Sequence, residues 1–427
     1  MNELSNELPD LTSDFWLKLK QKCSELQIIS LHIIPTDYAI GGKKSFEEKF
    51  GNGVPEDLEY LTRNQEVRNN PGLILEGARS VISISLSYHS SDYPADPHTG
   101  YISAYARGRD YHKVIKQRLD RLGNWLKNTF PDIRFRAITD SAPFYEQHFA
   151  KASVFMAKGR NNLVRLKNAG SMIFLGELLT TLNLPDPKKI ITMNTEKNTE
   201  SDYPFFTTVL NDASDENSNN CISGLSSGKN SLECPEKCRL CFSSCPTGAL
   251  NPEKFRIEKC ISYLTIEYGG YIPEELWSGL ENRIYGCDTC QLCCPFNKKT
   301  DITADPEFSS RFSQDFLKLS HLLSLTPEEF KKSFSGTPIL RIGYYKMMRN
   351  CIIAAVNTGS SEYISCLVIL RNSVLKRMNL LHAEITAGNT DGENYSEPDR
   401  LLREISECTM VLRHLEHAFT LLRNNHD

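Results

Sequence analysis

The feature that most constrains this 427-residue chain is its set of cysteines, which includes CPEKCRLCFSSCP from Cys234 and CDTCQLCCP from Cys287. Both runs are close to C-x2-C-x2-C-x3-C-P, the spacing with which short loops hold [4Fe–4S] clusters. The first run departs from it, because three residues instead of two separate Cys234 from Cys238. Cys245 and Cys294 are each followed by proline, as the last ligand of such a loop is. The pattern predicts two clusters and raises the question of how the longer gap presents its thiolate.

The ligands divide between two clusters, since the last cysteine of one run binds the other cluster in paired loops of this kind. One predicted set is Cys234, Cys238, Cys241 and Cys294, and the other is Cys245, Cys260, Cys287 and Cys290. Cys293 competes with Cys294, and Cys221 is the fallback if the long gap displaces Cys234. Zinc is the alternative, because C-x2-C pairs also form zinc sites, but the Cys-Pro closures favour clusters.

Composition limits the setting in which such clusters work. The net charge of −4 excludes a chain that is basic throughout, so a nucleic-acid partner has to be met by a local basic surface. The opening MNELSNELPDLTSDFW is unlike a signal peptide, and no stretch approaches the ~20 apolar residues of a membrane span. We expect a cytoplasmic protein with no membrane partner, in which reduced thiols serve as metal ligands.

Periodicity and polar runs divide the chain into four segments. SVISISLSY alternates as a half-buried strand does, whereas YHKVIKQRLDRLGNWLKNTF has helical spacing, so residues 1–186 predict an α+β domain with helices packed on a sheet. Residues 187–233, rich in Asn, Ser, Asp and Gly, predict a polar insertion or linker. Residues 234–300 form the expected ferredoxin-like domain with two [4Fe–4S] clusters, and residues 301–427 the expected C-terminal α-helical, HEAT-like domain.

The chain resembles the epoxyqueuosine reductases in several motifs that occur in the same order. Those around the cysteines are CPTGAL, KCISYLTIEYGGYIPEEL and NRIYGCDTCQLCCPFNK. Those upstream are EVRNNPGLILEGARSVISISLSY, YARGRDYHKVIKQRLDRL, TDSAPFYEQHFA and GSMIFLGELLTTLNLP, so the resemblance spans residues 58–357. It implies an oxidoreductase that converts epoxyqueuosine at the tRNA wobble position to queuosine, the last step of queuosine biosynthesis. It also implies two cofactors, cobalamin in residues 1–186 and the two [4Fe–4S] clusters.

The same resemblance implies roles for individual residues. Asp140, in the turn TDSAP, is the implied catalytic acid, although a carboxylate in such a turn otherwise caps local structure. Glu146 is interpreted as part of a structural salt bridge, and His112 as a contact of the corrinoid or of a phosphate, or as a packed residue at a helix start. The implied cobalamin contacts are Arg68, Asp140, Val164, Leu175, Ser262 and Asp288.

The segment ASVFMAKGRNN departs from the family, which has glycines where this chain has Val154 and Met156. Both side chains occupy positions where backbone approaches the cofactor closely in the family. Asn161 is retained, and Arg160 supplies the charge of the family's lysine.

Expected partners are the tRNA anticodon stem-loop that carries epoxyqueuosine and an external electron donor such as flavodoxin or ferredoxin, with the chain acting as a monomer. Candidate phosphate contacts are Lys151, Lys158, Arg160, Arg165 and Lys167, and on the C-terminal helices Arg341, Lys346, Arg349, Arg371, Lys376 and Arg377. Two other functions are open: a corrinoid and iron–sulfur reductase of another substrate, as reductive dehalogenases are, and a non-catalytic electron-transfer protein.

Overall fold

The computed structural model describes residues 13–50, 53–90, 96–140, 142–153, 156–184, 233–298, 300, 303, 305–386 and 396–424. Within these ranges, no helix is long and apolar enough to cross a membrane. The chain forms two compact units. Unit 1 comprises Met1–His89, Tyr111–Cys241 and Gln291–Glu307, and unit 2 comprises Ser90–Asp110, Phe242–Cys290 and Phe308–Asp427. The predicted insertion 187–233 lies outside the described residues, apart from Glu233. The division of the chain into four functional segments remains a prediction.

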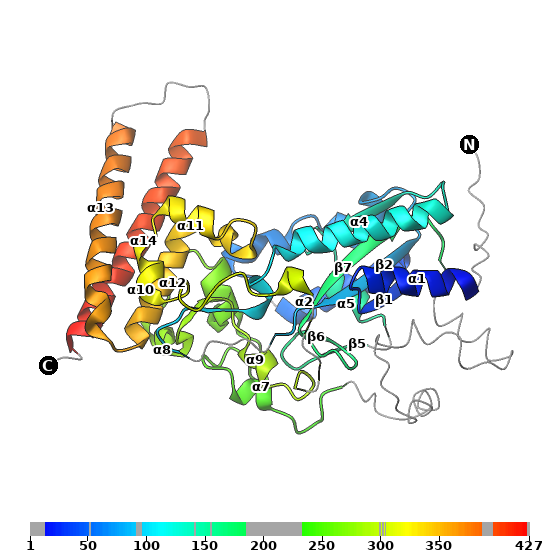
Figure 1. The fold of residues 1–427 in the computed structure, drawn as a ribbon, viewed down its shortest axis with the longest axis horizontal. Coiled ribbons are helices and arrows are strands. Elements are labelled where there is room, and N and C mark those ends of the chain that lie inside the picture. The colour runs from blue at the N-terminus through cyan, green and yellow to red at the C-terminus, as the bar shows by residue number, and fades with distance from the viewer. Residues whose placement is uncertain are drawn as a thin grey trace. The chain divides into compact units, whose positions relative to one another are not determined.

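Unit 1 is built on a four-stranded antiparallel sheet with the strand order β1-β2-β7-β4 (Figure 1). The strands are β1 (Ser30–Pro35), β2 (Ser80–Ser87), β7 (Ile173–Thr180) and β4 (Phe135–Ile138). The two longest strands, β2 and β7, are therefore central and pair with each other along their whole length. The expectation of an α+β fold is confirmed.

Helices cover both faces of this sheet. The predicted helix is confirmed as α4 (Tyr111–Thr129), and its Ile115 lies so close to Gly176 of β7 that a Cβ there would be 2.3 Å from Cγ2 of the isoleucine. On the opposite face, α5 (Glu146–Ala150) packs through Phe149. Strand β2 is consequently buried on both sides. The prediction of a half-buried strand, made from its alternation of apolar and polar residues, is therefore wrong.

Shorter elements complete unit 1. They are α1 (Ser13–Glu25), α2 (Gly42–Phe50), α3 (Gln65–Asn69) and the antiparallel pair β5 (Met156–Lys158) and β6 (Val164–Leu166). The chain passes from unit 1 to unit 2 within α7 (Leu240–Ser243) and returns to unit 1 within α9 (Thr289–Leu292). Both of these short helices carry predicted cluster ligands.

Unit 2 combines a two-stranded parallel sheet with a set of helices. The strands are β3 (Tyr101–Ile102) and β8 (Arg283–Tyr285). The helices are α8 (Trp277–Leu280), α10 (Leu319–Ser324), α11 (Pro327–Ser333), α12 (Gly343–Asn357), α13 (Ile364–Thr386) and α14 (Ser396–Asn424). The helices confirm the α-helical character predicted for residues 301–427, and α14 packs against both α12 and α13. Their HEAT-like character stays a prediction.

Side chains of helix α12 hydrogen-bond to the segment that follows Cys260. That segment contains a π-helical turn, Tyr263–Glu267, in which the N–H of Tyr268 donates to the carbonyl of Tyr263 at 3.0 Å. Asn350 donates to the carbonyls of Thr265 and Ile284, each at 2.9 Å. Side chains of α12 thereby hold the backbone between Cys260 and Cys287 in place.

Candidate functional site

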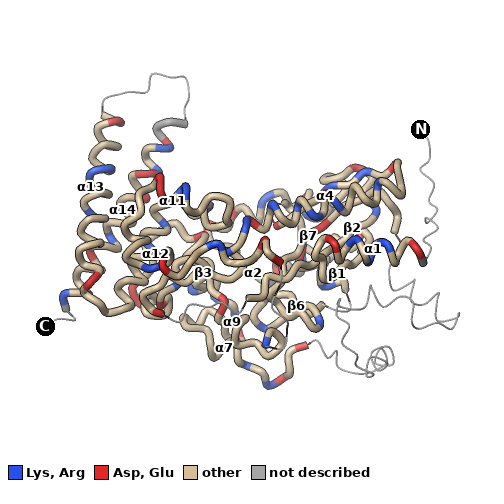
Figure 2. The backbone as a smooth tube through the Cα atoms, in the orientation of Figure 1, with Lys and Arg blue, Asp and Glu red and all other residues tan. Residues whose placement is uncertain are grey.

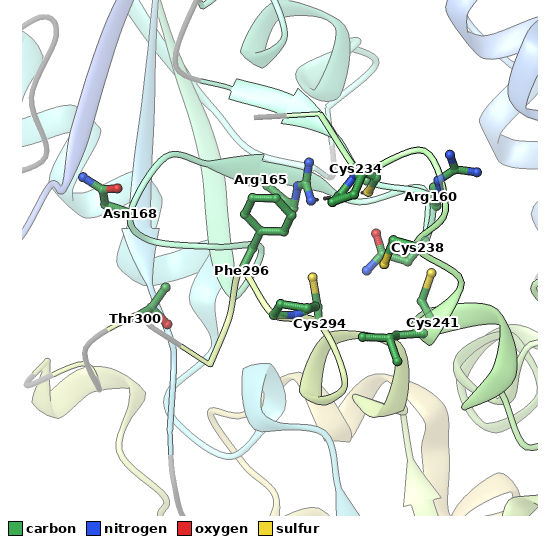
Figure 3. Close-up of a pocket in the computed structure, with 14 residues that line it drawn as sticks. Arg160, Arg165, Asn168, Cys234, Cys238, Cys241, Cys294, Phe296 and Thr300 are labelled. Carbon is green, nitrogen blue, oxygen red and sulfur yellow. Dashed lines mark hydrogen bonds between the residues drawn. The ribbon is translucent and has the colours of Figure 1, made fainter. Parts of the chain in front are cut away.

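Predicted ligands of one cluster surround a cavity in unit 1 (Figure 3). The cavity has a volume of about 430 Å³, and its lining includes Cys234, Cys238, Cys241 and Cys294. Cys294, and not its neighbour Cys293, is among the lining residues. Burial, reinforced by the sulfurs around it, raises the pKa of Cys241 to about 11. A metal that binds here therefore displaces the thiol proton. Four thiols around one cavity fit a [4Fe–4S] cluster.

A turn absorbs the extra residue between Cys234 and Cys238. The N–H of Cys238 donates to the carbonyl of Pro235 at 2.9 Å, which closes a β-turn. Nη2 of Arg160, in the loop between β5 and β6, donates to the carbonyl of Glu236 at 3.0 Å. Cys234 still reaches the cavity because the turn takes up the added length. The fallback ligand Cys221 lies outside the described residues.

Arg165 belongs to this cavity and not to an outer surface. Its side chain is 2% exposed, and Nη1 donates to Sγ of Cys234 at 3.4 Å. Its Cζ lies 3.9 Å from the ring centroid of Phe296, another lining residue. The prediction that Arg165 contacts phosphate is therefore wrong. Its positive charge therefore lies directly beside a predicted cluster ligand.

Predicted ligands of the other cluster gather in unit 2. Cys260 interacts electrostatically with Cys245 and Cys287, and its sulfur accepts hydrogen bonds from the backbone N–H groups of Ser262 and Tyr263. Burial raises the pKa of the Cys260 thiol to about 11. N–H donors around a ligand sulfur are one of the means by which proteins tune cluster potentials. The fourth predicted ligand, Cys290, lies in α9.

The two ligand sets follow the division of the chain into units. The first set lies in unit 1 and the second in unit 2, although Cys294 is distant in sequence from the rest of the first set. Among the described residues, no three His, Cys, Asp or Glu side chains are close enough to share one metal ion. Zinc thiolates at about 2.3 Å from one ion would lie about 3.8 Å apart, whereas the thiolates of a cubane each bind a different iron.

Asp140 follows β4 and receives two polar contacts from the start of α4. The hydroxyl of Tyr111 donates to Oδ2 at 2.5 Å, and Nε2 of His112 lies 2.6 Å from Oδ1. The ring of Tyr111 stacks on Phe174 of β7, with centroids 4.5 Å apart. The carboxylate is 43% exposed, so it is both fixed in orientation and open to a ligand. His112 is thus a partner of Asp140.

Two further carboxyl groups lie beside Asp140. Glu177, in the centre of β7, is fully buried and accepts from Oγ of Ser83 on β2 at 3.4 Å. The side chains of Glu146 and Glu177 hydrogen-bond to each other, which differs from the salt bridge predicted for Glu146. Sequence reasoning missed Glu177, although it is the one charged residue of the apolar strand IFLGELLT.

The predicted cobalamin contacts in unit 1 fall into two places. Arg68 is 9% exposed and donates to the carbonyls of Arg63 and Phe144, each at 3.3 Å, so it ties α3 to the chain after Asp140. Val164 and Leu175 lie together in a second place, an apolar cluster. It comprises Ala150, Met156, Val164 and Leu166, with the partly buried Ile29, Ala169, Ile173 and Leu175.

The departures in ASVFMAKGRNN are accommodated in different ways. The side chain of Met156 is 4% exposed and fills the apolar cluster, while Val154 lies outside the described residues. Asn161 lines the cysteine cavity, and its Oδ1 accepts from the N–H of Leu163 at 3.3 Å.

Asp288 is a fully buried carboxylate of unit 2. It accepts from the hydroxyl of Tyr101 at 2.8 Å, from the hydroxyl of Ser103 and from the N–H of Ala104 at 2.7 Å. Its two oxygens therefore bind the β3 segment next to the ligands Cys287 and Cys290.

Several basic residues of the C-terminal helices have internal partners. Arg349 is fully buried and donates to the carbonyls of Leu264, Tyr268 and Gly270 at 2.6, 2.8 and 3.0 Å, so the prediction of a phosphate contact is wrong for it. Three more make ion pairs or backbone contacts, namely Arg341 with Glu267, Lys346 with the carbonyl of Glu267, and Arg377 with Glu404. Arg371 and Lys376 are exposed on α13, whose charged residues are mostly basic (Figure 2).

These features define a class of protein: an α+β chain with two cysteine sets that suit paired iron–sulfur clusters. Residues 233–297 match the model of the 4Fe-4S double cluster binding domain, and residues 68–141 match that of Epoxyqueuosine reductase QueG, DUF1730. The Escherichia coli epoxyqueuosine reductase is 33% identical over 355 residues, which cover 81% of this chain and 82% of that protein. The Shewanella oneidensis enzyme is 31% identical and covers 92% of this chain and 93% of its own. The chain belongs to the epoxyqueuosine reductase family and is an oxidoreductase.

Solved structures share the fold. A crystal structure of epoxyqueuosine reductase with a tRNA-Tyr epoxyqueuosine-modified stem loop has a TM-score of 0.65 and 22% identity, and the match covers 94% of this chain and 99% of that one. The Streptococcus thermophilus enzyme has a TM-score of 0.64 and 23% identity.

Proposed function

We propose that this chain reduces epoxyqueuosine at the wobble position of tRNA to queuosine. The observation that carries the proposal is its identity of 31% to 35% to epoxyqueuosine reductases over most of their length. Opening an epoxide to an alkene and water consumes two electrons and two protons, so such an enzyme needs a source of each. The cysteine sets and the exposed Asp140 are groups of the required chemistry.

The electron carriers are two [4Fe–4S] clusters and cobalamin. Cys234, Cys238, Cys241 and Cys294 would hold one cluster, and Cys245, Cys260, Cys287 and Cys290 the other. Cobalamin, when bound, supplies a strongly reducing centre for the epoxide. The partly buried Ile29, Ala169, Ile173 and Leu175 offer an apolar surface that suits a corrin ring. Its other proposed contacts are Arg68, Asp140, Val164, Ser262 and Asp288.

Asp140 is the proposed acid that protonates the leaving oxygen. Tyr111 and His112 orient its carboxyl group, and the group is exposed on one side, where a substrate can reach it. Arg68 donates to the carbonyl of Phe144 and so steadies the chain that follows Asp140. A positioned acid of this kind contributes about 10²- to 10⁴-fold to a rate.

The proposed partners are a tRNA anticodon stem-loop and an external one-electron donor such as flavodoxin or ferredoxin, with the chain acting as a cytoplasmic monomer. The related enzyme solved with a modified tRNA stem loop supports the first of these. The helices α12, α13 and α14 form the proposed HEAT-like part of the chain.

The test is conversion of an epoxyqueuosine-containing stem-loop by anaerobic protein reconstituted with iron, sulfide and cobalamin. Nucleoside mass spectrometry should show loss of one oxygen atom. Reactions that omit cobalamin, or contain Asp140→Asn, serve as controls and should not proceed at the wild-type rate. A protein that holds both clusters and cobalamin but leaves epoxyqueuosine intact would favour a reductase of another substrate.

A further inference from the structure

The buried pair Glu146 and Glu177 requires a proton of its own. Oε1 of Glu146 and Oε2 of Glu177 are buried and have no hydrogen-bond donor among the described residues. The two side chains nevertheless form a hydrogen bond with each other. Two carboxylates are acceptors only, so a hydrogen bond between them requires that one is protonated. Contact between these two side chains therefore requires a proton on one of them.

The surroundings of the pair favour that protonated state. Burial raises the pKa of Glu146, and the nearby charges of Glu177 and Asp140 add to the effect, while Arg68 opposes it. Burial also raises the pKa of Glu177 to about 8, against the hydrogen bonds from Ser83 and Glu146. Two like charges that share a buried site cannot both ionise near neutral pH.

The pair lies near Asp140, the proposed acid. Asp140 interacts electrostatically with both glutamates, and Tyr111 and His112 contact it from α4. A substrate seated on the exposed side of Asp140 separates it from bulk water. A proton held behind Asp140 remains available under that condition.

We propose that Glu146 and Glu177 share one proton and return it to Asp140 after Asp140 has protonated the epoxide oxygen. The inference rests on the proposed function. Ring opening takes the first proton from Asp140, departure of the oxygen as water takes the second, and the two electrons come through the [4Fe–4S] clusters from the external donor. After the product leaves, the three carboxyl groups recover two protons from solvent.

Infrared spectroscopy of the purified, cluster-containing protein at pH 7 tests the shared proton without turnover. The wild type should show a protonated-carboxyl band that shifts in D₂O, changes frequency in Glu146→Gln and in Glu177→Gln, and is lost in the double variant. It should persist in Asp140→Asn and in the control Glu76→Gln, which changes an exposed glutamate of unit 1. Absence of the band from the wild type, or its persistence in the double variant, would overturn the proposal.

Unfolding at different pH values gives a second measurement of the same proton. Because the pKa of Glu177 is raised from 4.5 to about 8, the native protein binds more protons than the unfolded chain between these values. The wild type should therefore lose stability as pH rises from about 4.5 to about 8, and Glu177→Gln should lose less. An equal loss in both proteins would contradict the raised pKa.

Single-turnover conversion of the stem-loop tests delivery of the proton. Glu177→Gln should keep its iron content and stem-loop affinity, react at least about tenfold more slowly above pH 7, and recover rate when a small weak acid is added to the buffer. Glu76→Gln should match the wild type. An unchanged rate and pH profile in Glu177→Gln would contradict the proposed transfer of the proton to Asp140. Failure of the wild type itself would instead count against the proposed function, and the infrared result would still decide whether the pair shares a proton.

Discussion

Nε2 of His112 lies 2.6 Å from Oδ1 of Asp140, so the first turn of α4 holds the carboxyl group that follows β4. This contact joins two motifs that are 28 residues apart in the sequence, since 140 − 112 = 28. It gives Asp140 a fixed orientation without enclosing it.

Replacement of Asp140 should separate chemistry from binding. Asp140→Asn retains the shape of the side chain and removes its acidic proton, so conversion of epoxyqueuosine should fall at least about 100-fold. Iron content, cobalamin binding and stem-loop affinity should match those of the wild type. Conversion at a near-normal rate would refute the assigned role.

Iron content should report the ligand set in unit 1. Anaerobic wild-type protein should contain about eight iron and eight sulfide per chain, and Cys234→Ser should lose about half of each. Cys366→Ser, on α13, is the control and should lose none. If Cys234→Ser keeps both clusters, another residue supplies the ligand.

Arg165 should raise the reduction potential of the cluster held by Cys234. Reduction adds negative charge, which the buried guanidinium stabilises, so Arg165→Met should lower the potential by on the order of 60 mV, equivalent to about tenfold in a one-electron equilibrium. Spectroelectrochemical titration measures this shift. Lys158→Met removes an exposed charge from β5 and should leave the potential unchanged. Equal potentials in Arg165→Met and the wild type would show that Arg165 does not tune the cluster.

Arg349 should matter for stability and not for tRNA binding. Arg349→Met leaves one buried and two partly buried carbonyl groups without their donor, so the free energy of unfolding should fall by about 3 kcal/mol or more. Thermal unfolding measures the loss. A stable variant with weakened stem-loop affinity would return Arg349 to the tRNA surface.

The exposed cations of α13 are the better candidates for phosphate contacts. Arg371→Glu and Lys376→Glu should each weaken stem-loop binding and make its dependence on salt shallower by about one unit of slope. Binding at several salt concentrations tests this, with Lys331→Glu on α11 as the control. Affinities equal to that of the control would assign Arg371 and Lys376 to an ordinary solvated face.

Local patterns allowed the cysteine sets and the long helices to be predicted. Ligand spacing is a short-range property, and the apolar period of α4 is complete within its own 19 residues. The serines of β2 were misjudged because alternation does not distinguish solvent from a buried polar partner. Here that partner is Glu177, which is 94 residues from Ser83. Arg349 was misjudged for the same reason, since its acceptors lie about 80 residues earlier.

The turn that brings Cys234 to the cavity also has a consequence for the unfolded chain. A cluster bound by both Cys234 and Cys294 closes a loop of about 60 residues, and by analogy with a disulfide the lost chain entropy amounts to about 4 kcal/mol. Oxidative loss of iron would release this constraint and lower the free energy of unfolding by about the same amount. Oxygen would then inactivate the enzyme in two ways, through its electron supply and through its resistance to unfolding and proteolysis.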